Sequence, residues 1–370
     1  TFLYLLKACG RAKAIEKGEV VHAEILRQGF VRSNAKLGTA LVDMYAKCGA
    51  LAKAEEMFNF IHFRNLFSWS VLIEGYIQQG QGENALNCFE QMQCEGTLAD
   101  AVTLVCILKA CCMLDSLHKG TSIHAVILQQ GFLDVLLGSG LLDMYAKFGE
   151  LEKAQEVFNQ IPNPNVVCWT VLIAAYTQHG LGEKGLFFFA QMQEKGLTPD
   201  ALTYVCALNA CGSIAACDKG KEIHDEIIKG GLVEKYTPVS VALVDMYAKC
   251  GILLKAKEVF DNLCIRDVVS WTALVAGYAQ HGYCKEALDS FQQMQHEGHS
   301  PNVSTYVCIL KACGEKKAIN EGKEIHAKIV KEGFLVTNIL VGNALVDMYA
   351  KCGLLMKAQQ VLEELPVRDV

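Results

Sequence analysis

The sequence has no long hydrophobic run and no excess of positive charge. Its longest apolar stretch, Val166 to Tyr176, is far shorter than the roughly 20 residues that a membrane-spanning helix needs. The 370 residues carry a formal net charge of −6, so the chain as a whole does not attract a polyanion. These absences predict that no segment spans a membrane, and that any nucleic-acid site must be local.

The sequence also lacks the motifs of common enzymes. We find no phosphate-binding loop of the form G-x4-G-K-[ST] and no nucleophile elbow. His22 and His224 each begin an H-x-E triplet, but the P-C-x-x-C run that completes a zinc deaminase signature is missing. A C-x4-C spacing recurs from Cys106, Cys206 and Cys308, yet structural zinc wants four converging ligands. We therefore predict no catalytic site, no metal and no cofactor.

Cysteines are present in number, but not in the pattern of a disulfide scaffold. The 17 cysteines are spread over a long chain and lie inside helix-like patterns such as LKAC and YAKCG. We interpret them as reduced, buried thiols in an intracellular compartment. The first residue is Thr1 and no Arg- and Ser-rich leader precedes it, so we expect the chain to be part of a longer protein.

The dominant feature is an internal repeat of about one hundred residues. The segment LVDMYAKCG begins at Leu41 and recurs, once as LLDMYAKFG, at Leu141, Leu243 and Leu345. An IHA-like element and a tryptophan recur with the same spacing, at His22, His124, His224 and His326, and at Trp69, Trp169 and Trp271. The unit occurs nearly four times, and each copy contains three smaller units.

Each smaller unit has the apolar spacing of two short helices, with residues at i, i+3, i+4 and i+7 on one face. One unit has the stripes Trp271, Leu274, Val275 and Tyr278, then Ala287, Leu288, Phe291 and Met294. Gly282 should end its first helix, and Gly298 with Pro301 its second. The MYAKCG unit has Leu345, Met348 and Tyr349, then Ala358, Val361, Leu362 and Leu365. Hairpins of this kind must stack to bury their stripes, which predicts an all-α solenoid.

These patterns resemble the plant organelle pentatricopeptide repeat (PPR) proteins, in the PLS subclass that alternates three motif lengths. The residues that carry the resemblance are VVSWTALVAGYAQHGYCKEALDSFQQMQHEGHSPN, NALVDMYAKCG, and TYVCILKACG with EGKEIHAKIVKEGF. It implies a right-handed superhelix of about eleven helix-turn-helix motifs. The long motifs would be 1–34, 101–134, 201–236 and 303–338. The short motifs would be 35–65, 135–165, 237–267 and 339–369, and the standard ones 66–100, 166–200 and 268–302.

The resemblance implies that two residues of each motif select one RNA base: the fifth residue, on the first helix, and the last residue, in the following loop. Applied here, it pairs Thr39 with Asn65, Ser70 with Asp100, Ser139 with Asn165, Thr170 with Asp200, Val241 with Asp267, Thr272 with Asn302, and Asn343 with Asp369. Val241 can neither donate nor accept a hydrogen bond, so its base is left unread. Long motifs follow this pairing poorly.

Two further groups of residues are expected at the RNA. The second residue of each motif would hold the base between apolar side chains, at Phe67, Val167, Val269, Leu136 and Leu340. Lys36 and Pro238 occupy this position in the other short motifs and depart from the pattern. Four lysines follow the selecting residue by about two helical turns and could meet phosphates or simply form a solvated face: Lys47, Lys147, Lys249 and Lys351. The tryptophans are expected in the core rather than at the bases.

The resemblance implies sequence-specific binding of single-stranded RNA, as the recognition part of an organelle C-to-U editing or other RNA-processing factor. Thr or Ser with Asn implies adenine, Thr or Ser with Asp implies guanine, and Asn with Asp implies uracil. With parallel polarity the target reads nAGnAGnnAnU. The protein would act in a mitochondrion or chloroplast, with any deaminase domain outside this chain and with editing-complex proteins docking on the long motifs. The alternative is a protein-binding helical-repeat scaffold.

Overall fold

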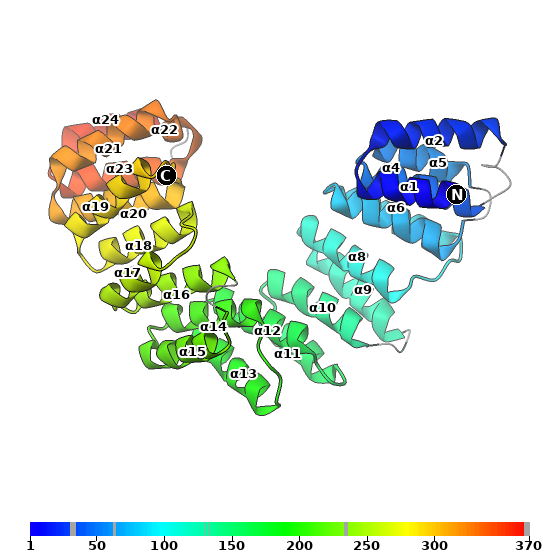
Figure 1. Ribbon diagram of the computed structural model, residues 1–370, viewed down its shortest axis with the longest axis horizontal. Helices are drawn as coiled ribbons and strands as arrows, with labels where there is room; N and C mark the ends of the chain where they lie inside the picture. Colours follow the sequence, from blue (N-terminus) through cyan, green and yellow to red (C-terminus); the bar gives the residue numbers. More distant parts are fainter. Residues whose placement is uncertain (30–34, 62–63, 130, 132, 233–235, 366–370) are drawn as a thin grey trace. The chain divides into compact units, whose positions relative to one another are not determined.

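The computed structural model contains only helices as regular elements in the part of the chain that it describes, which is residues 1–29, 35–61, 64–129, 131, 133–232 and 236–365 (Figure 1). The chain forms two compact units, Thr1–Ala175 and Tyr176–Val370, and their border lies inside helix α12 (Val166–Gln178). No helix within these described ranges has both the length and the apolar character to cross a bilayer. Because all regular elements of the described residues are helices, the predicted all-α fold is confirmed.

Unit 1 is a row of helical hairpins. Its pairs are α1 (Phe2–Arg11) with α2 (Ile15–Arg27), α4 (Ala35–Lys47) with α5 (Leu51–Asn59), α6 (Leu66–Gln78) with α7 (Gly82–Cys94), α8 (Ala101–Met113) with α9 (Leu117–Gln129), and α10 (Val135–Lys147) with α11 (Leu151–Gln160). Each pair lies inside one predicted motif. The motif boundaries fall in the loops and remain predictions.

Unit 2 continues the same scheme. After the second part of α12 and its partner α13 (Gly182–Glu194), the pairs are α14 (Ala201–Ser213) with α15 (Cys217–Lys229), α16 (Thr237–Lys249) with α17 (Leu253–Asp261), α18 (Val268–Gln280) with α19 (Cys284–His296), α20 (Val303–Lys316) with α21 (Ile319–Lys331), and α23 (Ile339–Lys351) with α24 (Leu355–Glu364). A single-turn helix, α22 (Phe334–Thr337), links the last two hairpins.

Within each unit the first helices of successive hairpins pack side by side and form a continuous layer. In unit 1 this layer runs α1, α4, α6, α8, α10, and in unit 2 it runs α14, α16, α18, α20, α23 (Figure 1). Second helices such as α5, α7, α17 and α19 pack against their own first helix and against the first helix of the following hairpin. Equivalent positions of the first helices therefore recur along one face of each unit.

The core consists of the predicted stripes. Trp271, Leu274 and Val275 are buried, as are their counterparts Trp169, Leu172 and Ile173 on α12. Each tryptophan contacts a phenylalanine of the preceding second helix edge-on, with ring centroids 4.5 Å apart for Phe260 and Trp271, a favourable geometry for aromatic pairs. The prediction that the tryptophans lie in the core is thus confirmed. The assignment of Leu362 to the buried stripe was wrong, because this side chain is 43% exposed while its neighbour Val361 faces inward. The prediction of buried thiols was wrong for Cys94 and Cys264, which are exposed.

Neighbouring first helices approach so closely that a glycine is required at the crossing. A Cβ added to Gly277 of α18 would lie 2.5 Å from the Cβ of Ala248 in α16, and one added to Gly75 of α6 would lie 2.7 Å from the Cβ of Ala46 in α4. A methyl group on a helix backbone cannot rotate away. The interaxial spacing of the first-helix layer therefore depends on these small residues.

We predict that Gly277→Ala lowers the free energy of unfolding by about 1 to 3 kcal/mol, the usual effect of overpacking. The sign is informative, because an unobstructed glycine-to-alanine change inside a helix stabilises by about 1 kcal/mol. Gly212→Ala is the matched control, since the nearest atom there is Cδ of the flexible Lys249 side chain at 3.1 Å and the nearest backbone atom, of Met246, lies at 3.4 Å. Urea unfolding followed by circular dichroism measures both variants. A Gly277→Ala protein as stable as the control would contradict the close approach.

A histidine–tyrosine hydrogen bond joins the second helix of each long motif to the following hairpin. The His Nδ1 atom lies 2.8 to 2.9 Å from the Tyr hydroxyl in His22–Tyr45, His124–Tyr145, His224–Tyr247 and His326–Tyr349. Burial lowers the pKa of all four imidazoles. In His22, His124 and His326 the buried Nε2 atom has no hydrogen-bond partner, so the imidazolium form, in which both ring nitrogens carry a hydrogen, has an Nε2–H group that nothing accepts.

Acidification should therefore destabilise the fold through these histidines. A lowered pKa means that the unfolded chain binds more protons near pH 6, so stability is retained above the ordinary histidine pKa and is lost as the pH falls below it. For His124 burial alone lowers the pKa, which makes His124→Gln the cleanest variant. We expect it to lose less stability than the wild type between about pH 7.5 and about pH 5.5. Equal losses in urea unfolding would show that His124 is not the sensor.

Candidate nucleic-acid interface

The predicted fifth residues lie on the first helices, and in four of them the hydroxyl oxygen lies close to a backbone carbonyl of the preceding turn. Ser70 Oγ on α6 lies 2.8 Å from the carbonyl oxygen of Leu66, and Thr272 Oγ1 on α18 lies 2.6 Å from that of Val268. Ser139 and Thr170 bond to carbonyls of the preceding turn in the same way, at 2.8 Å each. Exposure differs, because Thr39 and Thr170 are only 4% exposed, whereas Ser70 and Thr272 are half-buried.

The predicted last residues begin the next first helix. In each, one side-chain oxygen accepts the backbone N–H three residues later, which satisfies a donor that a helix start otherwise leaves unpaired. The acceptors and N···O distances are Asn65 3.0 Å, Asp100 2.9 Å, Asn165 3.1 Å, Asp200 2.8 Å, Asp267 2.8 Å and Asn302 2.9 Å. Asp369 lies outside the described residues.

This bond fixes the orientation of the selecting group. An N–H can be accepted only by an oxygen, so the Asn302 amide must place Oδ1 toward the helix and leave its NH2 group for another partner. The Asp100 carboxylate likewise uses Oδ1 toward the helix and leaves Oδ2. The remaining atom is a donor in one case and an acceptor in the other. Asn and Asp therefore differ in chemistry at one point in space.

Two clefts collect the predicted residues. In unit 1 a cleft of about 550 Å³ is lined by Asn65, Phe67, Ser70 and Asp100, with Glu74 and Val102 beside them. In unit 2 a cleft of about 660 Å³ is lined by Pro238, Val241, Asp267, Val269, Thr272 and Asn302. The structure thus brings the fifth and last residues of two standard motifs together with their apolar second residue. Thr170 belongs to unit 1 and Asp200 to unit 2, and each keeps the local geometry of its equivalents.

The predicted clamp residues are apolar and exposed. Their exposed fractions are 64% for Phe67, 53% for Val167, 59% for Val269, 45% for Leu136 and 61% for Leu340. Val102 and Leu202, which were not predicted, occupy the same second position in long motifs and are 53% and 61% exposed. The register alone could have found both. Apolar side chains on this face leave flat surface that an aromatic base can cover.

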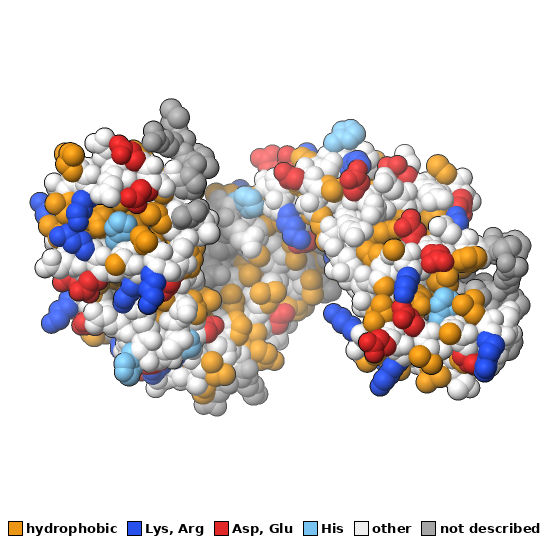
Figure 2. All heavy atoms as spheres, turned by 90° about the horizontal axis from the view of Figure 1, so that it is seen from above, with side chains coloured by type: hydrophobic (Ala, Val, Ile, Leu, Met, Phe, Trp, Pro, Cys, Tyr) orange, Lys and Arg blue, Asp and Glu red, His pale blue; other side chains and the backbone are white. Residues whose placement is uncertain are grey.

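The four lysines are not isolated cations. Each forms an ion pair of 2.7 to 2.8 Å with an aspartate one turn earlier on its helix: Lys47 with Asp43, Lys147 with Asp143, Lys249 with Asp245, and Lys351 with Asp347. The hydrogen bond from Asp143 raises the pKa of Lys147, and that from Asp347 raises the pKa of Lys351. Figure 2 shows basic and acidic side chains interspersed on the face in view rather than gathered in a basic stripe.

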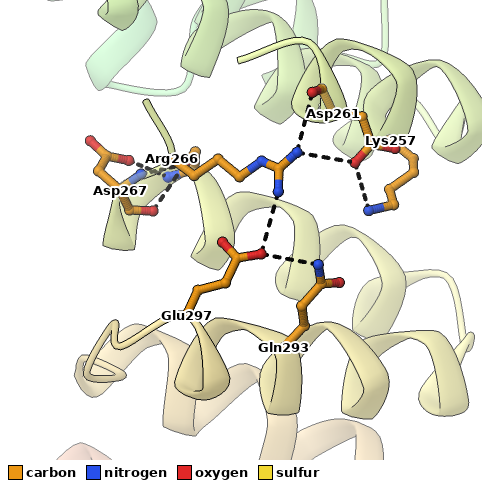
Figure 3. A network of polar contacts seen from close by, with 7 residues as sticks. Lys257, Asp261, Arg266, Asp267, Gln293 and Glu297 are labelled. Carbon is orange, nitrogen blue, oxygen red and sulfur yellow. Dashed lines mark hydrogen bonds and ion pairs between the residues drawn. The ribbon is translucent and has the colours of Figure 1, made fainter. Parts of the chain in front are cut away.

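An arginine anchors the loop before two of the selecting residues. Arg266, next to Asp267, donates to Glu297 at 3.3 Å and to the carbonyl of Asp261 at 3.2 Å, and its guanidinium lies 5.1 Å from the Phe260 ring (Figure 3). Arg64, next to Asn65, makes the same pair with Glu95 at 2.7 Å. Neither arginine was predicted, although each directly precedes the last residue of a short motif, Asn65 or Asp267. Within the described ranges, no group of three or more metal-binding side chains converges.

Comparison with known proteins gives the family. A PPR repeat family model matches residues 64–113, 164–213 and 266–315, and a PPR repeat model matches 39–66, 139–163 and 343–370. A chloroplastic pentatricopeptide repeat-containing protein of Arabidopsis thaliana is 37% identical over 100% of this chain and 59% of its own length. A mitochondrial one from the same plant is 35% identical over 95% of this chain and 51% of its own.

The fold comparison agrees. The maize pentatricopeptide repeat protein PPR10, in complex with an 18-nt psaJ RNA element, superposes with a TM-score of 0.73 over 89% of this chain and 48% of that chain, at 18% identity. The chain spans little more than half the length of the curated relatives. Because the matched repeat models together cover more than half of its residues, the chain belongs to the pentatricopeptide repeat family.

Proposed function

We propose that this chain binds single-stranded RNA in a sequence-specific manner, with one base at each standard or short hairpin. The observation that carries the proposal is the cleft in unit 1, where Ser70, Asp100 and the exposed ring of Phe67 converge, and its counterpart in unit 2. A base placed there would stack on the apolar second residue and present its edge to the two polar residues. The RNA-bound state of PPR10 supports the proposal.

The last residue would separate bases by their ring nitrogen. The free Oδ2 atom of Asp100 accepts a hydrogen bond and so suits guanine or uracil, whose ring nitrogen carries a proton. The free NH2 group of Asn302 donates and so suits adenine or cytosine, whose ring nitrogen has a lone pair. The helix-capping bond supports this assignment, because it fixes which atom of each side chain is left for the base.

The fifth residue would supply a second contact. The hydroxyl hydrogen of Ser70 has partners within the protein, so Ser70 Oγ can offer the base only a lone pair. Guanine has an amino group beside its protonated ring nitrogen, whereas uracil has only carbonyls there, so an acceptor with Asp100 favours guanine. Adenine and cytosine both carry an amino group, so the preference of Thr272 with Asn302 for adenine rests on the family resemblance.

Applied along the chain, these pairs give the target nAGnAGnnAnU. We propose that the motifs alternate as in the PLS subclass and that the protein serves organelle RNA editing or another RNA-processing step, with any deaminase domain outside these residues. The names of the relatives support a chloroplast or mitochondrion. Lys47, Lys147, Lys249 and Lys351 would meet phosphates by exchanging their aspartate partners, which makes binding salt-dependent.

The second candidate function, a scaffold for proteins, has a specific observation in its favour. The second helices of the long motifs expose an apolar side chain at one recurring position: Leu26 54%, Leu128 53%, Ile228 56% and Val330 52%. These residues lie on the second helices, away from the layer that carries the selecting residues. We propose that editing-complex proteins dock there, so that RNA binding and protein docking use different layers of the same hairpins.

The proposed function predicts that an 11-nucleotide RNA with the sequence nAGnAGnnAnU binds more tightly than a scrambled RNA of the same composition. Each mismatch at a well-formed contact costs about 1 to 3 kcal/mol, so two mismatches should weaken binding at least tenfold. Gel mobility shift or fluorescence anisotropy at fixed salt measures both dissociation constants. Equal affinities across scrambled sequences would reject sequence-specific recognition.

The second prediction concerns Asn302. Asn302→Asp should move the preference at the ninth base from adenine to guanine, because it replaces the outward donor by an acceptor and keeps the oxygen that caps α20. Asp100→Asn should make the opposite change at the third base. Asn302→Ala is the control, since it removes both functions and should cost about 1 kcal/mol of stability. An unchanged adenine preference in Asn302→Asp would remove this base assignment.

A further inference from the structure

A buried threonine joins the two selecting residues of a standard motif, although it belongs to the following long motif. Thr103 Oγ1 lies 2.7 Å from Ser70 Oγ and donates to Asp100 Oδ1 at 2.6 Å. Thr305 Oγ1 lies 2.7 Å from Thr272 Oγ1 and donates to Asn302 Oδ1 at 3.0 Å. Both threonines are 0% exposed. The same arrangement thus occurs independently in each unit.

The hydrogens in this arrangement can be counted. Thr272 and Thr305 have one hydroxyl hydrogen each, and three contacts: Thr272 with the Val268 carbonyl, Thr272 with Thr305, and Thr305 with Asn302 Oδ1. The carbonyl and amide oxygens only accept, and two hydroxyl oxygens at 2.7 Å need a hydrogen between them. Two hydrogens can serve only two of these contacts. With Thr305 donating to Asn302 Oδ1, the hydrogen between the two hydroxyl groups comes from Thr272, and the contact of Thr272 with the Val268 carbonyl has no hydrogen. Thr305 Oγ1 also accepts the backbone N–H of Asn302 at 3.2 Å, and Thr272 offers only lone pairs to the cleft.

We propose that Thr103 and Thr305 are specificity-determining positioning residues, which hold the last residue of the preceding standard motif in the orientation that reads its base. This inference rests on the proposed function. The threonine places two donors, its backbone N–H and its hydroxyl, on one side-chain oxygen of Asp100 or Asn302. Two donors on one atom restrict rotation of the carboxylate or amide more than the helix cap alone.

The role differs between motif classes. At the junctions before standard motifs, Ser68 and Ser270 occupy the equivalent position, but their hydroxyl groups donate to the backbone carbonyls of Asn65 and Asp267. Those serines hold the loop rather than the selecting side chain. The fifth residues of the long motifs include Val105 and Val307, which cannot form hydrogen bonds. A long motif therefore contributes polar chemistry to the base of its predecessor.

The test uses Thr103→Val and Thr305→Val, which keep side-chain shape and remove the hydroxyl, and RNAs that carry guanine or adenine at the third or ninth base. Thr103→Val should reduce the guanine-over-adenine ratio at the third base roughly 3- to 10-fold, the size of one lost hydrogen bond, and leave the ninth base unchanged. Thr305→Val should reduce the adenine-over-guanine ratio at the ninth base only. Each variant is the matched control for the other.

Thr103→Ser and Thr305→Ser should restore discrimination, because the hydroxyl returns. The double variant Ser70→Ala with Thr103→Val should lose less than the sum of the single losses if the two hydroxyl groups act as a unit. Unchanged ratios in the valine variants, or losses at both bases from either variant, would overturn the positioning role. A wild-type chain that discriminates at neither base would instead reject the proposed function itself.

Discussion

The constraint on which the structure depends is the unpaired N–H at the start of each first helix. A helix leaves its first backbone donors without partners, and a side-chain oxygen at the residue before it is the local remedy. Asn and Asp supply that oxygen at the six described junctions that follow a short or a standard motif, whereas Tyr236 before α16 makes no such bond. Because the cap occupies one atom, the other atom is held at a fixed point beside the first-helix layer. One Asn or Asp residue therefore both caps the helix and presents either a donor or an acceptor beside it.

The regular spacing of the first helices repeats this arrangement from one hairpin to the next. Gly75 and Gly277 let neighbouring first helices approach until backbone and small side chains touch, and the histidine–tyrosine bonds tie the second helices of long motifs to the hairpins that follow. Neither device touches the clefts. Both keep equivalent positions at equivalent places within each unit, so that Ser70 and Thr272 have the same neighbours although about two hundred residues separate them.

The sequence predicted the fold well because a helical hairpin repeats its apolar spacing in every motif. Trp271, Leu274 and Val275 were placed correctly by periodicity alone, while Leu362 was wrong because spacing leaves the edge of a stripe ambiguous. The selecting positions came from a family resemblance, and the structure brings several of them into shared clefts. The role of Thr103 was not predicted, because apolar periodicity shows which side of a helix a residue faces but not which residue it contacts. Its hydrogen bonds are to Ser70 and Asp100, in the preceding motif.

The net negative charge of the chain bears on how it would bind RNA. The four lysines already form ion pairs with aspartates on their own helices. A phosphate would have to replace the carboxylate, so the lysine would lose one ion pair for each one that it forms. Exposed ion pairs of this kind contribute little free energy. Under the proposed function, affinity would then come from stacking on side chains such as Phe67 and Val269 and from hydrogen bonds at base edges. Both depend on which base is present, whereas backbone charge does not. When phosphate contacts contribute little, a larger fraction of the binding free energy depends on the bases. Sequence-specific binding requires this, because phosphate contacts are the same for every RNA sequence.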